Sequence, residues 1–398
     1  MNSPNKIKVQ ALLLTAALPA AYLCVVVILD TLPMPGAAVQ ARRAALAHRA
    51  TSAPPSSASQ QHWHRVWTCP LGVSLPGAPA AWSNGWVATA GRGHIMSLDN
   101  RGRLLWDHSF SNVYFTGSPT VADATAVAVG SDGDVLAMDA MTGTLQWRVK
   151  IDGAYSQGPL ALRRGEAWQV VLLSAVDGVL RSLDAKDGKV LHQSPPTNET
   201  DGEPGCDGHY LAYGNCDAAV HVFNPTNGEP VAQISVGPGA VSKDTLTEMP
   251  TGVMAGGVLV CDGRVYGGTG GGELVCVDVA GSNVAWRVFM TADVAFNTPV
   301  AAGNLVIMGS RDGKVTAFAA RDGAEQWQVS LSNVVKSLCV VDDAVFTVAG
   351  GALVGLRVKD GRRFLHVPIG DDVDGPVWNG RILVVAADGG NVIGFKGE

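Results

Sequence analysis

The sequence predicts an all-β protein: an eight-bladed β-propeller of four-stranded antiparallel blades, preceded by an N-terminal transmembrane helix and a linker. Three observations predict the propeller. A sequence unit recurs at intervals of roughly 40 residues. Each unit contains short apolar runs bounded by Gly, Asp or Asn, and several units end in a Trp at a fixed distance from a Gly. A repeat of this length with strand-like content is typical of propellers, whose blades are sheets set around an axis.

The repeat occurs eight times. The clearest unit runs from Gly130 to Trp147 and reads GSDGDVLAMDAMTGTLQW, and units with the same spacing begin at Gly91 and Gly309. Weaker copies begin at Ala175, Gly214, Gly268, Ala349 and Ala387. Because each unit corresponds to one blade, the repeat predicts eight blades.

Each unit is expected to form four strands, which we name A to D from the axis outward. A proline often introduces strand A, as at Pro119, Pro159, Pro299 and Pro376. Strands B and C correspond to short apolar runs such as residues 125–130 and 135–138. The turns between them read SDGD, VDG, TGGG, SRDG and ADGG. These residues tolerate the positive φ that tight hairpins require.

Tryptophans on strand D are expected to pack each blade against the next, because a large aromatic buries much area where an outer strand has little else to anchor it. The predicted docking residues are Trp67, Trp106, Trp147, Trp286 and Trp327. In the weaker blades His192, Ala232 and Leu365 hold that position.

The two ends of the repeat region are expected to share one blade. The last unit stops at residues 395–398 without an outer strand, whereas residues 64–70, HRVWTCP, form a lone strand before the first unit. Trp67 precedes Gly91 by 24 residues, the interval that also separates Trp106 from Gly130. The N-terminal strand should therefore supply strand D of the last blade and leave no open sheet edge.

The acidic and glycine-rich turns are interpreted as architecture. Asp132, Asp134 and Asp139 lack the alternating oxygen ligands and closing carboxylate of a calcium loop. No helix pattern follows the glycine run 267–272, which argues against a dinucleotide loop. No G-x-S-x-G motif occurs, and the nine histidines show no metal-ligand spacing. We therefore predict neither catalytic residues nor a metal site.

Composition narrows the function further. Only 16% of the 398 residues are charged and the net charge is -6, so no basic stripe for nucleic acid is expected. Seven cysteines do not make a disulfide framework in a chain of this length. Cys206 and Cys216 are the closest pair, and the sequence leaves open whether they are joined.

The N-terminal region predicts a membrane anchor. Residues 9–29 carry no charge, with Lys6 and Lys8 before them and Asp30 after, which is long enough to span a bilayer. A cleaved signal peptide is the alternative. The predicted organisation is an anchor or uncleaved signal in residues 1–32, a flexible linker in 33–62 and the propeller in 63–398. The propeller is expected on the extracytoplasmic side, in a periplasm, at a cell surface or in a secretory lumen.

One blade carries a family motif. Residues 137–147, AMDAMTGTLQW, match the A-x-D-x-x-T-G-x-x-x-W tryptophan-docking motif at every fixed position. The chain thus resembles the quinoprotein-like, or PQQ-like, propeller repeat family, and the resemblance extends over all eight units from about Trp63 onward. The motif specifies a repeat type well and an activity poorly.

Two branches of that family suggest different functions. The enzymes are dehydrogenases that hold PQQ over a calcium ion, often beside two adjacent cysteines, which this sequence lacks. The other branch resembles BamB, a non-catalytic eight-bladed scaffold in outer-membrane assembly. Cys24 follows Ala21-Tyr22-Leu23, a poor match to the lipoprotein cleavage site expected there. We predict a non-catalytic scaffold that binds protein partners without a cofactor. A PQQ-dependent dehydrogenase or a small-ligand binder is the alternative.

The predicted binding surface is the face formed by the D-to-A loops and the B-to-C turns. Loops on a rigid scaffold commonly carry binding, and here they are the segments in which the repeats differ most. The candidate residues are Tyr114, Phe115, Tyr155, Leu246, Met249, Phe296, Asp371, Asp372 and Asp374. An aromatic patch beside an acidic rim would suit a partner with apolar anchors and basic flanks. The alternative is that the aromatics cap the blade ends and the aspartates are solvated turn residues.

Overall fold

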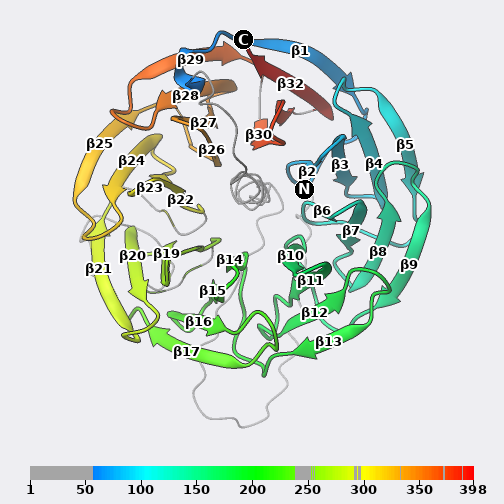
Figure 1. The fold of residues 1–398 in the computed structure, drawn as a ribbon, viewed down its shortest axis with the longest axis horizontal. Coiled ribbons are helices and arrows are strands. Elements are labelled where there is room, and N and C mark those ends of the chain that lie inside the picture. Colours follow the sequence, from blue (N-terminus) through cyan, green and yellow to red (C-terminus); the bar gives the residue numbers. More distant parts are fainter. Residues whose placement is uncertain are drawn as a thin grey trace, which may run out of the picture. The chain divides into compact units, whose positions relative to one another are not determined.

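The computed structural model describes residues 57–398 apart from 238–251, 253, 255, 291–293, 295–296, 332, 371–372 and 388. The described chain forms eight four-stranded antiparallel sheets set around a common axis, as Figure 1 shows. The predicted eight-bladed propeller is thereby confirmed. The predicted membrane helix at residues 9–29 lies outside the described part of the chain. Within that part, no helix has both the length and the apolar character needed to cross a bilayer.

The first four blades follow the chain in order. Blade 1 consists of β2 (Ala80–Trp82), β3 (Gly85–Ala90), β4 (His94–Asp99) and β5 (Leu104–Ser109). Blade 2 consists of β6 (Thr120–Ala122), β7 (Thr125–Val129), β8 (Asp134–Asp139) and β9 (Leu145–Lys150). Blade 3 consists of β10 (Leu160–Arg164), β11 (Ala167–Leu173), β12 (Leu180–Asp184) and β13 (Val190–Gln193). Blade 4 consists of β14 (Gly205–Cys206), β15 (Leu211–Gly214), β16 (Ala219–Phe223) and β17 (Pro230–Ser235).

The remaining blades continue the ring. Blade 5 consists of β18 (Leu259–Cys261), β19 (Arg264–Gly268), β20 (Glu273–Asp278) and β21 (Asn283–Phe289). Blade 6 consists of β22 (Val300–Ala302), β23 (Leu305–Gly309), β24 (Lys314–Ala319) and β25 (Glu325–Ser330). Blade 7 consists of β26 (Leu338–Val341), β27 (Ala344–Ala349), β28 (Ala352–Arg357) and β29 (Arg363–Pro368). Blade 8 consists of β30 (Val373–Trp378), β31 (Leu383–Ala387), β32 (Asn391–Gly397) and β1 (Trp63–Pro70).

Blade 8 joins the two ends of the propeller, as the sequence predicts. β1 pairs antiparallel with β32, from Trp63 opposite Gly397 to Pro70 opposite Asn391. Ahead of β1, a short 3-10 helix, η1 (Ala58–Gln60), lies against blade 7, where Ser59 N donates a hydrogen bond to Asp343 Oδ1 at 3.0 Å. Residues 57–62, which fall within the predicted linker, are therefore held by the propeller.

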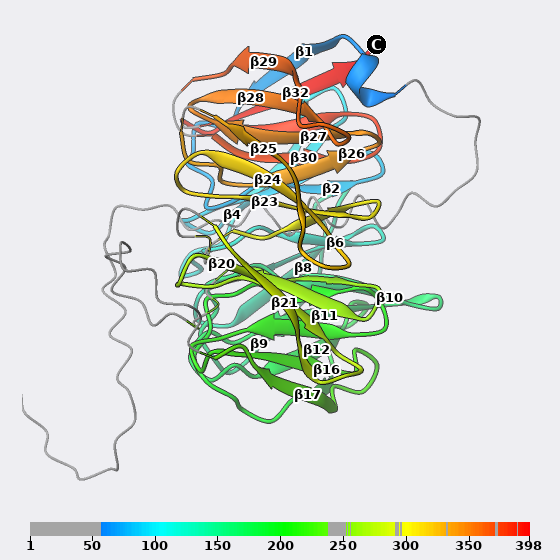
Figure 2. The ribbon, with the colours of Figure 1, turned by 90° about the vertical axis from the view of Figure 1, so that its left-hand side faces the viewer.

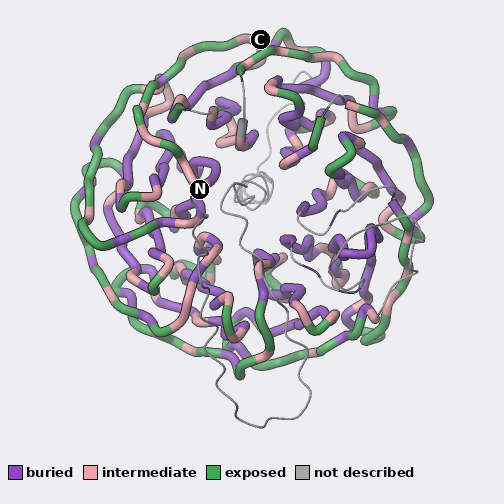
Figure 3. Tube along the Cα trace, turned by 180° about the vertical axis from the view of Figure 1, so that it is seen from behind, coloured by how far each residue is buried: buried purple, intermediate pink, exposed green. Residues whose placement is uncertain are grey.

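The hydrophobic core lies between neighbouring blades. Strand B of blade 1, β3, is buried along its whole length, whereas strand D, β5, buries only Trp106. Figure 3 shows the same division, with exposed residues concentrated on the outermost strands. Both faces of each blade contact a neighbour, so the inner strands are continuously apolar rather than alternating. One such core joins Val127 and Ala137 of blade 2 to Val170 and Leu172 of blade 3.

Each strand-D tryptophan contacts the following blade. Trp106 Nε1 donates to Ala140 O at 3.1 Å, and Trp147 Nε1 donates to Ala185 O at 2.9 Å. Trp67, Trp286 and Trp327 make the equivalent hydrogen bonds to Asn100 O, Ala320 O and Val358 O. Each acceptor lies in the C-to-D turn of the next blade, so these contacts link consecutive blades around the ring.

The strand order gives the propeller two distinct faces. D-to-A loops and B-to-C turns lie on one, which we call the D–A face; A-to-B and C-to-D turns lie on the other, which we call the C–D face. In Figure 2 the C terminus and η1 lie on the same side as the β10–β11 hairpin, an A-to-B turn. The described chain therefore begins and ends on the C–D face.

Candidate functional site

The D–A face is braced by backbone hydrogen bonds between its loops and turns. In blade 2, Ser131 of the B-to-C turn donates its N–H to Tyr114 O at 2.8 Å and accepts from Tyr155 N at 3.0 Å. The loop that enters the blade and the loop that leaves it thus hold the same turn. Such bracing fixes the bases of the loops on a rigid scaffold, which favours precise presentation of side chains.

The same bracing recurs in other blades. In blade 6, Val335 N donates to Ser310 O at 3.2 Å. In blade 4, Cys216 N donates to Glu199 O at 3.0 Å and Met254 N donates to Asn215 O at 3.3 Å. The D–A face is therefore a set of fixed loop bases rather than a set of independent loops.

Two of the predicted binding aromatics are buried. Phe115 is fully buried, forms a bridge with Gly130 and packs among residues of blades 1 and 2. Tyr155 is 2% exposed, its O accepts from Thr116 Oγ1 at 2.8 Å and its hydroxyl donates to Asp152 O at 2.9 Å. Burial raises the pKa of the Tyr155 phenol, which stays protonated at neutral pH. Both side chains close the ends of blades and are not available to a partner.

Tyr114 differs from its neighbour because it is 57% exposed. Its ring covers Gly91 in the B-to-C turn of blade 1, where an added Cβ would lie 3.2 Å from three atoms of the ring end. Its main-chain oxygen takes part in the bracing of blade 2. Among the described members of the predicted set, Tyr114 is the aromatic that presents apolar surface to solvent.

The acidic part of the prediction is only partly described. Asp374 lies on β30 of blade 8, and its carboxylate is 3.9 Å from Lys336 Nζ. Its side chain is 15% exposed, so this carboxylate does not form an open acidic rim. The structure does not bring Asp374 together with Tyr114. Tyr114 lies in the loop between blades 1 and 2, whereas Asp374 lies in blade 8. The other candidates lie outside the described residues: Leu246, Met249, Phe296, Asp371 and Asp372.

The ends of the longest D-to-A loop lie close together. A Cβ at Gly252 would approach Gly237 O to 2.4 Å. On the adjoining strand end, Val236 N donates to Ala218 O at 2.8 Å and Val236 O accepts from Arg287 Nη2 at 2.9 Å. Arg287 also pairs with the buried Glu273 at 3.1 Å. The segment between Gly237 and Gly252 thus starts and finishes at one point, fixed across blades 4 and 5.

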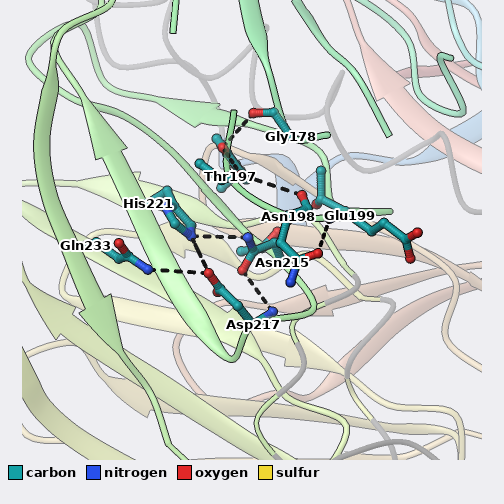
Figure 4. A network of polar contacts seen from close by, with 11 residues as sticks. Gly178, Thr197, Asn198, Glu199, Asn215, Asp217, His221 and Gln233 are labelled. Atoms are coloured by element: carbon teal, nitrogen blue, oxygen red, sulfur yellow. Dashed lines mark hydrogen bonds and ion pairs between the residues drawn. The ribbon is translucent and has the colours of Figure 1, made fainter. Parts of the chain in front are cut away.

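A buried polar network beside this loop was not predicted from the sequence. His221 Nε2 lies 3.1 Å from both Asn215 Nδ2 and Asp217 Oδ2, and Figure 4 shows how the three side chains face one another. Gln233 Nε2 donates to the same Asp217 oxygen at 3.3 Å. The imidazole is 5% exposed and stacks on Tyr213. These contacts fix the B-to-C turn of blade 4.

The second half of the network ties blade 4 to blade 3. Tyr213 Oη donates to Gly178 O at 2.7 Å and lies 2.8 Å from Thr197 Oγ1. Burial raises the pKa of the Tyr213 phenol, which keeps its proton for this hydrogen bond. A sequence signal did exist, because blade 4 has Asn-Cys-Asp-Ala where other blades have a glycine turn. The network positions loops; within the described residues, no three His, Cys, Asp or Glu side chains are placed to hold a metal ion.

Comparisons with known proteins agree with the propeller fold. A family described as outer membrane protein assembly factor BamB matches residues 59–207 and 216–393. The BamB of Nitrosomonas eutropha is 24% identical over 229 residues, which cover 55% of this chain and 50% of that protein. The BamB of Bordetella pertussis is 23% identical over 254 residues, which cover 61% of each. The aligned part thus spans between half and two thirds of these two relatives.

Solved structures show the same fold. The crystal structure of BamB from Moraxella catarrhalis has a TM-score of 0.69 at 18% identity and covers 84% of this chain and 100% of that chain. The quinohemoprotein alcohol dehydrogenase ADHIIG of Pseudomonas putida has a TM-score of 0.66 at 13% identity, covering 91% and 80%. At these identities the likeness concerns the propeller alone. The match of the family over most of the propeller is more specific, and the chain therefore belongs to the family of the outer membrane protein assembly factor BamB.

Proposed function

We propose that this protein is a non-catalytic propeller scaffold that binds protein partners in outer-membrane protein assembly through its D–A face. The matched relatives bear the name of an outer membrane protein assembly factor, which supports the process. A fold alone does not establish a function, so the binding surface is argued from the site.

The bracing of the loop bases carries this proposal. Tyr114 O accepts a hydrogen bond from Ser131 N in the B-to-C turn of blade 2, which fixes the backbone of Tyr114, yet its side chain is 57% exposed. An aromatic that is rigid before binding loses little conformational freedom on contact with a partner. Aromatic side chains of this kind are enriched among residues that dominate binding energy.

We propose further that residues 9–29 anchor the protein, with the propeller of residues 63–398 on the extracytoplasmic side. The uncharged run and the preceding lysines support this topology. An extracytoplasmic location also agrees with a role in outer-membrane assembly. Sequencing the mature N terminus tests it, because a terminus near residues 39–44 would mean that the segment is cleaved.

Site-specific crosslinking tests the D–A face. A photoreactive amino acid replaces Tyr114 in full-length protein, and a matched variant carries it at Met141, which is 47% exposed in a C-to-D turn on the opposite face. We expect position 114 to crosslink a component of the outer-membrane assembly machinery and position 141 to give no such product. Equal crosslinking at both positions would exclude the D–A face.

The non-catalytic assignment has its own test. Purified protein is incubated with PQQ and calcium and assayed for dye-linked oxidation of alcohols and sugars. We expect no activity above that of PQQ and calcium alone. Turnover at ordinary enzyme rates would make the dehydrogenase alternative correct.

A further inference from the structure

The C-to-D turns offer an internal comparison, because blades repeat one local structure. In four blades an aspartate ends strand C and accepts a hydrogen bond from a backbone N–H two residues later. These aspartates are Asp99, Asp139, Asp184 and Asp278. Blade 7 has Arg357 at this position, although Arg357 N still donates to Arg362 O at 3.0 Å as the turn requires. The turn is therefore conserved in shape within the molecule and reversed in charge.

Blade 7 concentrates positive charge at this turn. We call residues 357–363 the blade-7 basic turn; its cations are Arg357, Lys359, Arg362 and Arg363. With Asp360 as the only carboxylate, four minus one gives a net charge of +3 in a chain whose net charge is -6. Lys359, Arg362 and Arg363 are exposed.

These cations are not neutralised by neighbours. Elsewhere on the C–D face, Arg103 pairs with Asp99 at 2.7 Å and Arg321 pairs with Asp322 at 2.9 Å. Among the side chains that the structure describes, none forms an ion pair with a cation of the blade-7 basic turn. Asp360 accepts from Arg362 N at 3.0 Å and so serves the turn itself. The charge of this turn is thus available to an external anion.

The chain enters the propeller beside this turn. The Asp343 carboxylate accepts hydrogen bonds from Ser57 Oγ, Ser59 Oγ and Ser59 N, which fixes the residues ahead of β1. Asp343 O accepts from Val358 N at 2.8 Å, and Val358 is part of the blade-7 basic turn. One residue therefore contacts both the incoming chain and the turn.

We propose that the blade-7 basic turn binds the anionic phospholipid surface of the membrane that holds residues 9–29. The choice of a lipid surface rests on the proposed anchor, since Ser57 and Ser59, which follow the uncharged run in the sequence, are held beside this turn. Three of the cations, Lys359, Arg362 and Arg363, are exposed side by side on one turn, which suits a surface of many headgroups. Lys and Arg side chains close to an anionic lipid surface are attracted to it, and salt screens this attraction.

Lysine acetylation of the full-length protein measures this contact. The protein is placed in nanodiscs of phosphatidylcholine alone or with phosphatidylglycerol. The acetylation rate of Lys359 is compared with that of Lys186 and Lys189, exposed lysines in the C-to-D turn of blade 3. With phosphatidylglycerol we expect Lys359 to react about fivefold more slowly, on the scale of one basic residue at such a surface. Raising the salt to about 0.5 M should restore the rate.

Paired variants separate local charge from total charge. Arg362→Gln with Arg363→Gln should abolish the protection of Lys359, whereas Lys186→Gln with Lys189→Gln removes the same charge from blade 3 and should leave it unchanged. Equal rates for Lys359 in both kinds of nanodisc overturn the proposal. The same acetylation assay with polyglutamate in place of nanodiscs tests the alternative of an acidic protein partner. Stronger protection of Lys359 by polyglutamate than by phosphatidylglycerol would also overturn the proposal.

The anchor is scored independently by co-elution of the protein with phosphatidylcholine nanodiscs. If co-elution fails, the proposed anchor is wrong. The turn is then tested by sedimentation of the same protein with phosphatidylglycerol vesicles at low salt. Sedimentation that Arg362→Gln with Arg363→Gln abolishes supports the turn; absence of sedimentation overturns it.

Discussion

At the scale of single residues, the close contact between a tryptophan and a glycine decides how blades fit together. Gly188 has a φ of 73° and lies against Trp147, where an added Cβ would be 2.7 Å from the indole. Gly165 has a φ of 59°, but nothing lies within 4 Å of an added Cβ. The two positions therefore separate the cost of a positive φ from the cost of a steric clash.

Gly188→Ala should destabilise the protein more than Gly165→Ala. Both replacements strain the backbone by roughly 1–2 kcal/mol, and overpacking against Trp147 adds roughly 1–3 kcal/mol at position 188. Urea unfolding followed by tryptophan fluorescence measures the difference. Equal losses of stability would show that the tryptophan contact can relax without cost.

Buried thiols give a second prediction at this scale. Burial raises the pKa of Cys206 and Cys276 to about 11 and that of Cys339 to about 12. Because the thiolate is the reactive form, these three cysteines should resist a thiol reagent at pH 8 and react after unfolding in urea. Cys206 and Cys216 are both free in the structure, which answers the question that their spacing left open. Mass spectrometry of the alkylated protein measures the labelling. Labelling of Cys206 in the native state would contradict the predicted resistance of the buried thiols.

At the scale of elements, the attachment of η1 depends on one carboxylate. Burial would raise the pKa of Asp343, but hydrogen bonds from Ser57 and Ser59 hold it below its ordinary value of 3.8. A carboxylate whose pKa is lowered by folding stabilises the folded state above the unfolded pKa, and this contribution is lost as the pH falls through the folded pKa. The attachment should hold at neutral pH, weaken as the pH falls below 3.8 and be lost below the still lower pKa of the folded state.

Asp343→Asn should release η1 without unfolding the propeller. Asparagine cannot accept all three hydrogen bonds as strongly as a carboxylate, so residues 57–62 should exchange backbone amides at least about tenfold faster at pH 7. Asp342→Asn is the control, because Asp342 is an exposed neighbour. Hydrogen exchange read by mass spectrometry gives the answer. Unchanged exchange in Asp343→Asn would mean that packing of Trp63 holds the segment.

The sequence predicts elements better than the surroundings of a loop side chain. Strand count, turn positions and the pairing of β1 with β32 follow from the repeat, since each blade reports on the others. Tyr114 and Phe115 were predicted together, yet one is exposed and the other fully buried. The bridge between Phe115 and Gly130 decides which of them points inward. The network around His221 joins blade 4 to blade 3. Its residues are far apart in the sequence, so a pattern within one stretch of sequence cannot predict that they meet.

At the scale of the whole molecule, stability should depend on β1. Deletion of residues 57–70 would remove the outer strand of blade 8 and expose the edge of β32. It would also expose the hydrophobic cluster in which the rings of Trp63 and Phe346 pack with their centroids 4.6 Å apart. Unpaired strand edges favour association between molecules. We expect a melting temperature lower by at least about 10 °C and growth of large particles by light scattering. A variant that melts like the wild type and stays monomeric would show that β1 is dispensable.

The pairing of β1 with β32 also sets the order in which the protein can mature. Trp63 and Gly397 are partners although 334 positions separate them along the chain, so β1, the first of the described strands, must wait for β32. A chain that has been synthesised or exported only through blade 7 therefore has two unpaired strand edges, which favour aggregation. Premature termination anywhere before residue 391 leaves both edges open, which marks the product for chaperones and proteases. Closure of the ring therefore reports that β32 has been synthesised.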